Sequence, residues 1–366
     1  MKKSWNFGLA FFILLQGAFA QGEKSDKETP KLFFSGFLDL YYFYDFNQPE
    51  ADIRQPFFYN HNRHNQVNAN LITGKVSLSH SAYRANLALH VGTYVTDNYA
   101  KEPDWLKMFQ EANFGVALNS TQNLWLDVGI FNSHIGFESA ISIDNWTLTR
   151  SLLAENSPYF ETGVKLTFSP NKKWEFAGMV LTGWQRIQAV KGNSLPSFGT
   201  QAKFFPSKKV LVNWSSFLGT EDPDEVRRIR FFNNFYGQFQ LTERLGMIAG
   251  FDVGIQQKER ASSDYDSWIA PIVIAQYTIH NKWKAGFRAE YYQDRAGVII
   301  SVQSPEGFQT SGLSLNLDYS PVPNLALRVE SRWLKSPFKV LGSGNNLNEE
   351  DFFIGTPIAF KTPQKK

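Results

Sequence analysis

The sequence predicts an all-β protein whose strands close into a transmembrane antiparallel β-barrel of about 16 strands. Three observations lead to this fold class. The first segment after the N-terminal region alternates like a membrane-spanning strand, and similar segments recur along the chain. The connectors between these segments are alternately short and long. The chain also begins with the features of an export signal.

Residues 33–46 form the first predicted strand. Their even positions carry no charge, whereas the odd positions include Ser35, Asp39 and Asp45. Side chains of a strand alternate between two faces, so one face of this segment is uncharged. About a dozen residues is the length that a tilted strand needs to cross a bilayer. We expect the even positions to face lipid and both aspartates to face the interior.

The N-terminal residues predict export. Lys2 and Lys3 precede an apolar run at 7–15, and the small residues Ala18 and Ala20 fit a cleavage site. The run is too short for a membrane anchor, the alternative interpretation. We therefore expect a signal peptide at 1–20 and a flexible periplasmic leader at 21–31. The barrel would follow at 32–360 and a short tail at 361–366.

The composition agrees with a strand-built membrane protein. The 366 residues include 16% aromatics, and the mean hydropathy of −0.31 is ordinary because only alternate residues of a barrel meet lipid. The longest apolar run after the signal, 268–275, is too short for a spanning helix. The chain has no Cys, which excludes disulfides and thiolate chemistry. The sequence has no stripe of basic residues of the kind that binds nucleic acid.

Connector lengths predict the topology. The clearest later strands are predicted at 83–95, 124–131, 160–168, 311–319 and 325–333. Short connectors lie at 80–81, 119–123, 169–173, 206–209, 242–244, 280–282 and 320–324. Long polar connectors lie at 47–66, 96–110, 132–159, 185–197, 220–228, 257–266, 294–309 and 335–350. Short periplasmic turns and long extracellular loops are typical of outer-membrane barrels.

An even number of strands follows if both termini lie on the periplasmic side. Segment 145–151 is therefore assigned to the third long loop, since counting it as a strand breaks the alternation. Segment 268–279 is the weakest strand because Pro271 interrupts it and both of its faces are apolar. The last strand, 351–360, ends on an aromatic residue, a feature that the barrel-insertion machinery reads.

A barrel of about 16 strands is wide enough for a water-filled channel. The charged side chains expected to line it are Asp39, Arg84, Glu111, Asp127, Glu161, Lys165, Arg230, Asp252, Arg288, Glu290, Asp318, Arg328, Glu330 and Arg332. Their signs are mixed, so we expect a hydrated lining with weak charge selectivity. The alternative role for each is cross-strand pairing that holds the wall in register.

The third long loop, 132–159, is the candidate constriction because it is the longest. It carries Glu138, Asp144, Arg150 and Glu155, which could orient a polar solute. The alternative is an ordinary surface loop.

Aromatic residues near predicted strand ends suggest girdles at the two membrane interfaces. They are Tyr41, Tyr42, Tyr44, Trp125, Trp174, Trp184, Trp214, Trp268, Trp283 and Trp333. A sugar-stacking track inside the lumen is the alternative.

The sequence offers little for enzyme chemistry, and we expect no cofactor and no metal. His61 and His64 could reach one metal ion, but a solvated polar loop is the simpler interpretation. Ser133 and His134 are adjacent, so on a strand they would point to opposite faces and make a poor catalytic dyad.

Several short motifs, in their order along the chain, resemble the β-barrel porin-2 (OmpL-like) family. They are Ser35–Asn47, Glu111-Ala112, Gly129–Glu138, Asn145–Ser151, Thr162-Gly163 and Gly183-Trp184. The resemblance covers nearly all of the expected mature chain, most firmly 33–190. It implies an outer-membrane porin-like channel without catalytic residues or cofactor.

The sequence therefore predicts a passive channel for small hydrophilic solutes in the outer membrane of a Gram-negative bacterium. Its expected partners are outer-membrane lipid and lipopolysaccharide, the insertion machinery, the solutes and, as porins often trimerise, two further copies in a homotrimer. The alternatives are an outer-membrane barrel enzyme of the lipase or deacylase type and a substrate-specific transporter.

Overall fold

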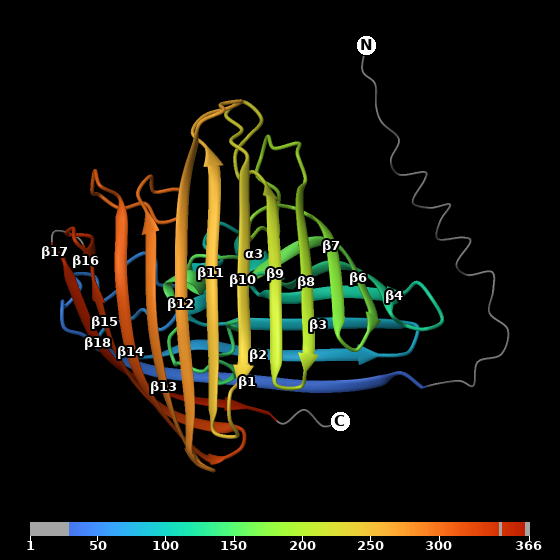
Figure 1. Ribbon diagram of the computed structural model, residues 1–366, viewed down its shortest axis with the longest axis horizontal. Helices are drawn as coiled ribbons and strands as arrows, with labels where there is room; N and C mark the ends of the chain where they lie inside the picture. The colour runs from blue at the N-terminus through green and yellow to red at the C-terminus, as the bar shows by residue number, and fades with distance from the viewer. Residues whose placement is uncertain (1–28, 344–345, 363–366) are drawn as a thin grey trace.

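Sixteen strands form one closed antiparallel barrel in the computed structural model, which describes residues 29–343 and 346–362 (Figure 1). The expected signal peptide, most of the leader and the end of the tail lie outside the described residues. Each strand pairs with its neighbours in sequence, and β1 (Lys31–Asp45) closes the barrel against β18 (Glu350–Lys361). The predicted fold class and strand number are confirmed.

The remaining barrel strands are β2 (Val67–Ser79), β3 (Tyr83–Val91), β4 (Phe109–Ala117), β5 (Leu124–Asn132), β6 (Phe160–Asn171), β7 (Trp174–Leu181), β8 (Ser197–Ser207), β9 (Val210–Gly219), β10 (Arg230–Gln240), β11 (Leu245–Gln257), β12 (Tyr265–His280), β13 (Trp283–Asp294), β14 (Phe308–Val322) and β15 (Leu325–Lys335). Strands β16 (Leu341–Ser343) and β17 (Asn346–Asn348) pair in the last long loop. The helical turns are α2 (Thr93–Asn98), α3 (Asp104–Lys107), η1 (Ser142–Asp144) and α4 (Leu152–Glu155). None of the helices described is long and apolar enough to span a bilayer.

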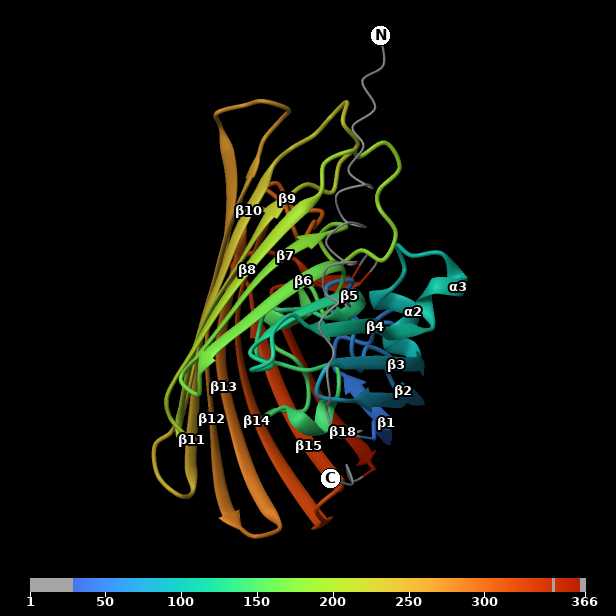
Figure 2. The same ribbon diagram turned by 90° about the vertical axis from the view of Figure 1, so that its right-hand side faces the viewer.

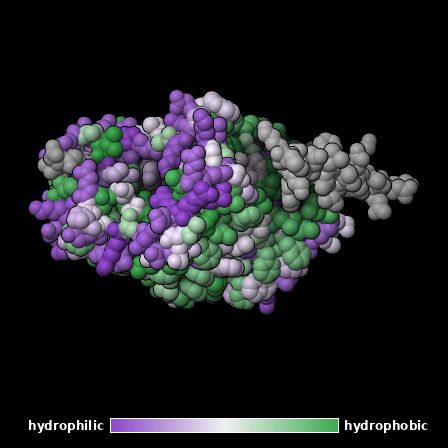
Figure 3. All heavy atoms as spheres, turned by 90° about the horizontal axis from the view of Figure 1, so that it is seen from above, coloured by the Kyte–Doolittle hydropathy of each residue, from purple (hydrophilic) through white to green (hydrophobic). Residues whose placement is uncertain are grey.

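The first strand has the predicted faces. Asp39 and Asp45 are fully buried in the barrel interior, while Phe34 and Phe46 on the other face are exposed. Apolar side chains gather on the outer surface beside the hydrophilic loops (Figure 3). Exposed members include Phe198, Trp214, Phe235, Phe251 and Val273. Large apolar side chains left uncovered in this way are typical of the outer face of a membrane barrel.

Two local predictions about strands have different outcomes. Segment 145–151 forms no strand and lies in the third long loop, as predicted. The strand predicted at 83–95 ends at Val91, because Gly92 adopts a φ of 134° and α2 begins directly after it. Val95 is therefore a buried residue of a helix rather than a lipid-facing residue of a strand.

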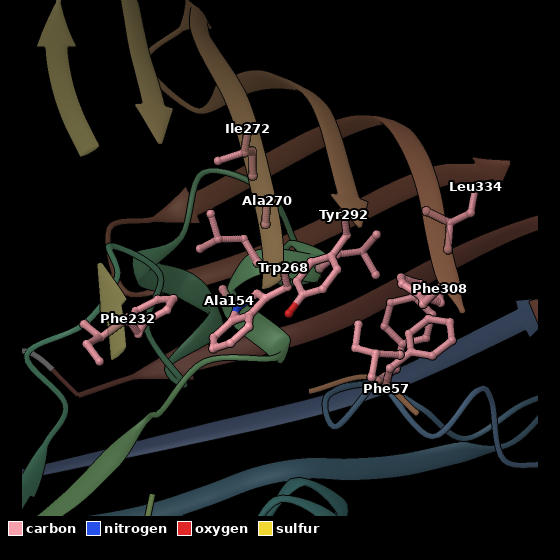
Figure 4. Packing of buried hydrophobic residues seen from close by; sticks show 14 of the residues in the cluster. Phe57, Ala154, Phe232, Trp268, Ala270, Ile272, Tyr292, Phe308 and Leu334 are labelled. Atoms are coloured by element: carbon pink, nitrogen blue, oxygen red, sulfur yellow. The ribbon is translucent and has the colours of Figure 1, made fainter. Parts of the chain in front are cut away.

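Pro271 is accommodated inside β12. It lies opposite Phe251 of β11, whereas the pairing with β13 breaks between Ile269 and Ile272. Proline has no N–H to donate, so one side of the strand loses its ladder at this residue. The inward side chains of β12 are apolar because a loop packs on them. Figure 4 shows Trp268, Ala270 and Ile272 facing Ala154 of that loop.

The hydrophobic core lies in the lumen. Its main cluster joins wall residues such as Trp268 and Phe353 to Phe58 of the first long loop and Leu152 of the third. The expectation of an open, water-filled interior is therefore wrong for this part of the barrel. Strand number fixes the width of the barrel, but it does not determine how much of that width the loops fill.

The outward position expected of girdle residues is found for part of the aromatic set. Trp174, Trp214, Trp283 and Trp333 are exposed on the outer surface. Tyr41, Trp184 and Trp268 are buried inside instead, and Trp125 lies beside the inward-facing Arg84, with its ring centre 4.4 Å from the guanidinium carbon. Proximity to a strand end does not distinguish the two faces of a barrel wall.

Candidate channel and its constriction

The third long loop, L3 (residues 133–159), is bound to the inner wall of the barrel. Arg288 donates to the Thr149 carbonyl at 2.6 Å, Arg328 to the Ser142 carbonyl at 2.7 Å and Arg332 to the Arg150 carbonyl at 3.1 Å. A loop inside a barrel has no strand partner, so its backbone groups must find other donors and acceptors. The arginines of β13 and β15 supply the donors.

Carboxylates of the same two strands supply the acceptors. Glu330 accepts from the Thr149 amide at 2.6 Å, and Glu290 accepts from the Leu152 amide at 2.7 Å. Arg288 also pairs with Glu330 at 2.9 Å, and Arg328 with Asp318 at 2.7 Å. All are buried. The hydrated lining expected at these positions is therefore wrong, since L3 covers them and leaves them buried.

The first long loop, L1 (residues 46–66), also lies inside the barrel. His61 contacts Asp39 with Nε2 and Oδ2 2.9 Å apart, and Arg54 contacts Asp45 at 3.3 Å. The guanidinium of Arg54 lies 3.5 Å from the centre of the Phe353 ring. The prediction of a solvated first loop is wrong, because these polar groups meet the buried aspartates of β1. Within the described part of the chain, no three His, Asp or Glu side chains are grouped as metal ligands.

Loops L1 and L3 meet at Glu155. This carboxylate accepts from the Tyr59 amide at 3.0 Å and pairs with Arg150 at 3.2 Å. Arg150 in turn lies against Tyr159, with its guanidinium carbon 3.3 Å from the ring centre. Burial alone would lower the pKa of Arg150, but the Glu155 carboxylate raises it above its usual value, so the arginine stays charged.

Cavities lie on both sides of this junction. The outer vestibule, of about 240 Å³, lies among the long loops and is lined by L3 at Glu155, Asn156 and Ser157. The inner vestibule, of about 440 Å³, opens toward the short turns and is lined by L3 at residues 133, 135–141, 144, 158 and 159. The linings of the two vestibules therefore adjoin at residues 155–159, here called the septum.

The other charges of L3 also have partners. Asp144 reaches Lys361 at 2.6 Å near the short-turn end of the barrel. Glu138 accepts from Ser151, and burial raises the pKa of this carboxyl above its usual value. The four charged residues predicted in this loop thus do not form one acidic and one basic side of an eyelet.

The inner vestibule and the wall beside it carry ion pairs whose cations are partly exposed. Lys75 pairs with Glu111 at 2.8 Å and Arg84 with Asp127, Nε to Oδ1, at 2.7 Å. The Arg84 side chain is 37% exposed, in contrast to the dry arginines beneath L3. Lys75 was missed in the sequence, although it lies on the inward face of β2.

His134 and Glu161 form a buried pair at the start of L3. His134 Nδ1 lies 2.9 Å from Glu161, and Nε2 lies 2.8 Å from the Ser216 carbonyl, so both ring nitrogens face acceptors. Burial by itself lowers the pKa of His134, but Glu161 outweighs burial and the net shift is upward. Ser133 also donates to Glu161, at 3.2 Å.

Three predicted lining residues have no oppositely charged group within 4.0 Å among the described residues. Asp252 contacts Asn234 at 2.5 Å. Lys165 lies 4.5 Å from the centre of the Phe131 ring, and Arg230 donates to Gln256. Among the described residues, no carboxylate lies within 4.0 Å of the charged groups of Lys165 or Arg230.

Comparisons with solved structures find the same architecture. The anion-selective porin from Comamonas acidovorans aligns with a TM-score of 0.61 at 8% identity, covering 91% of this chain and 100% of that one. The outer membrane channel DcaP of Acinetobacter baumannii aligns with a TM-score of 0.58 at 10% identity, covering 93% and 100%. OmpT of Vibrio cholerae aligns with a TM-score of 0.56 at 8% identity, covering 93% and 100%.

No curated protein sequence matches the chain. A family model, by contrast, spans residues 31–361 and is described as putative beta-barrel porin-2, OmpL-like. This range includes every barrel strand and every loop that enters the lumen. The chain therefore belongs to the putative beta-barrel porin-2, OmpL-like, family of outer-membrane channels.

Proposed function

We propose that the protein is a passive, non-enzymatic diffusion channel for small hydrophilic solutes, with the septum as its constriction. The observation that carries this proposal is the pair of vestibules that meet residues 155–159 from opposite sides. The path between them is narrow, because L1 and L3 fill much of the lumen. Small solutes are therefore favoured over large ones.

The paired charges of the inner vestibule support a preference for polar solutes over any one sign of charge. A carboxylate lies beside Lys75 and another beside Lys361, so both signs are present there. Such a wall remains hydrated and presents donors and acceptors to a passing solute.

The Ser133–His134 arrangement favours a structural role over the enzyme alternative. His134 contacts Glu161 and the Ser216 carbonyl, and Ser133 contacts the same glutamate. A catalytic dyad requires the imidazole to accept from the serine, and here the imidazole has other partners.

Family membership points to the outer membrane of a Gram-negative bacterium. We propose that residues 1–20 direct export, that 21–31 form the periplasmic leader and that β18 addresses the insertion machinery. The exposed apolar outer surface would then contact outer-membrane lipid, and the long loops would lie near lipopolysaccharide.

A homotrimer is the assembly that we propose, through the side of the barrel formed by β3–β5. These strands have nine residues each, whereas β12 has 16. Helix α3 projects from this side (Figure 2), and its Trp105 is 68% exposed. One of the OmpT structures is a trimer form. Native mass spectrometry should detect a trimer that Trp105→Ala weakens, and a monomer in mild detergent would contradict this assembly.

Planar lipid bilayers test the channel proposal. The purified protein should produce stepwise, ohmic increases in conductance as single molecules insert. Bilayers that stay sealed although the inserted protein is folded would refute a channel and favour the enzyme alternative.

A further inference from the structure

Arg230 has an unusual environment for an arginine at the entrance of a channel. It is the first residue of β10, it lies on the long-loop side, and only 6% of its surface is exposed. Its Nε and Nη2 both donate to the carboxamide oxygen of Gln256, at 3.0 and 2.8 Å. Its partner is therefore neutral, whereas a buried arginine ordinarily requires a carboxylate.

Two tryptophans hold this guanidinium in place. Its carbon lies 5.0 Å from the centre of the Trp184 ring and 5.8 Å from that of Trp268. Both rings are buried and come from different elements, the fourth long loop and β12. Aromatic faces stabilise a cation without neutralising it. The third nitrogen, Nη1, makes no hydrogen bond within the described part of the chain.

Arg230 lines two adjoining cavities. One is the outer vestibule, and the other, here called the rim cavity, has a volume of about 310 Å³. Four cations line the rim cavity, namely Lys101, Arg186, Arg228 and Arg230, against the three carboxylates Glu221, Asp222 and Asp266. The cations therefore exceed the carboxylates by one.

The pairing of these groups increases the excess. Glu221 is shared, at 3.1 Å from Arg186 and 3.5 Å from Lys101. Asp266 is 3.8 Å from Lys258, which lies outside the cavity lining. Asp222 is occupied by Arg228, at 2.8 Å. None of these three carboxylates lies within 4.0 Å of the Arg230 guanidinium nitrogens.

The carboxylates of the outer vestibule are also occupied. Asp97 pairs with Arg63 at 2.7 Å and Glu155 with Arg150 at 3.2 Å. Glu102 accepts from the amides of Ile187 and Gln188, both at 3.0 Å. None of these groups neutralises Arg230 on the side of the outer vestibule.

We propose that the rim cavity binds a small oxyanion, a carboxylate or a phosphate, through the free Nη1 of Arg230. A fixed, desolvated guanidinium with an unused donor matches such an anion, and charge-assisted hydrogen bonds to oxyanions are strong. This inference rests on the proposed channel and names its preferred solutes as anionic. The mixed signs of the charges along the rest of the lumen predict weak charge selectivity there. Selection for anions therefore occurs at the rim cavity.

Two substitutions test the site from opposite directions. Arg230→Gln removes the cation. Gln256→Glu keeps the arginine and places a carboxylate of nearly the same shape against it. Lys335→Gln is the control, because Lys335 is an exposed cation that pairs with Glu350 at 2.9 Å and does not line the rim cavity. Heat-modifiable migration on gels verifies that each variant forms a barrel.

Calorimetric titration of the folded full-length protein in detergent, with inorganic phosphate and with acetate, measures binding without any ion flow. The wild type should bind at least one of the two anions, and the stronger ligand shows whether phosphate or carboxylate is preferred. Arg230→Gln and Gln256→Glu should each weaken binding about ten- to a hundredfold, the worth of a hydrogen bond to a charged group. Lys335→Gln should bind like the wild type.

A wild type that binds neither anion overturns the proposal, as does unchanged binding in both site variants. If Arg230→Gln fails to fold, Gln256→Glu decides alone. Anion binding by a protein that passes no current would refute the channel and leave the site intact, so the two failures are distinguishable. In a potassium chloride gradient, a conducting wild type should prefer chloride, and both site variants should lose that preference.

Discussion

Glu155→Gln should open the septum by removing one charge at the junction of L1 and L3. Glu155 and Arg150 lie 3.2 Å apart, and their side chains are only 1% and 2% exposed. The glutamine oxygen can still accept from the Tyr59 amide, which now lies 3.0 Å from the carboxylate. The substitution therefore removes the charge and preserves the shape.

The expected cost follows from the geometry of the pair. At an effective dielectric constant of about 20, unit charges at this distance attract by about 5 kcal/mol. Breaking a buried pair by removing one partner costs about 3–5 kcal/mol, because the other charge is left uncompensated. Arg150 should then move toward water and leave the Tyr159 ring that it now covers. Contact between the loops weakens, and the path between the vestibules widens.

Single-channel recording and denaturant titration measure the two consequences. Glu155→Gln should show larger conductance steps, more open-channel noise and a lower unfolding midpoint. Glu350→Gln is the matched control, since it removes the same charge from an ion pair, with Lys335, whose side chains are both more than half exposed. Water and salt screen such a pair, so neither quantity should change. Wild-type conductance and midpoint in Glu155→Gln would refute the proposed role of the junction.

Three further predictions concern the anchors of L3 and the wall. Arg328→Met should increase amide exchange at 142–145, because two carbonyls lose their donor, whereas the exposed Lys335→Gln should not, and equal exchange in both variants would contradict the anchoring role. The pKa of His134 is raised in the folded state, so protonation of this residue stabilises the fold. This stabilisation should be complete below pH 6.5 and should be lost as the pH rises through the folded-state pKa. The unfolding midpoints of the wild type and His134→Asn should therefore converge at high pH. Gly129→Ala should impair barrel formation, measured by heat-modifiable migration on gels. Gly129 has a φ of 125°, and an added Cβ would overlap the Ala112 carbonyl oxygen. A normally folded variant would show that the wall can shift there.

The wall of the barrel could be predicted from the sequence because its rule is local. Alternation of residues sets the two faces of a strand, and the connector lengths set the topology. Asp39 illustrates this, since its parity in residues 33–46 predicted an inward position and it is fully buried there. The same parity on β2 would have identified Lys75.

The filling of the lumen could not be predicted in this way, because it depends on contacts between segments distant in sequence. The residues of L1 and L3 show no periodicity that would indicate which side chains are buried. Their polar residues are equally compatible with a loop exposed to solvent. His61 is buried because its ring contacts the Asp39 carboxylate. The spacing of these residues in the sequence cannot reveal that contact. One signal was present, however: the apolar inward face of β12 required a cover, and L3 provides it.

Charge pairing was likewise invisible in the sequence. Arg288 and Arg230 are both inward-facing arginines with a similar neighbour in the wall. Arg288 lies two residues before Glu290 on β13, and Arg230 lies opposite Gln256 of β11. In the structure one is buried between carboxylates and the carbonyls of L3, whereas the other meets only a carboxamide. Their different roles follow from the three-dimensional arrangement of the loops.

Modification of a single cysteine in the septum tests the central claim most directly. The chain has no cysteine, so Ser157→Cys introduces one unique thiol at a position that lines the outer vestibule. A charged thiol reagent added on the long-loop side should reduce the single-channel conductance, and a reducing agent should restore it. Complete modification, verified by mass, with unchanged conductance would show that ions pass elsewhere and would contradict the septum as the constriction.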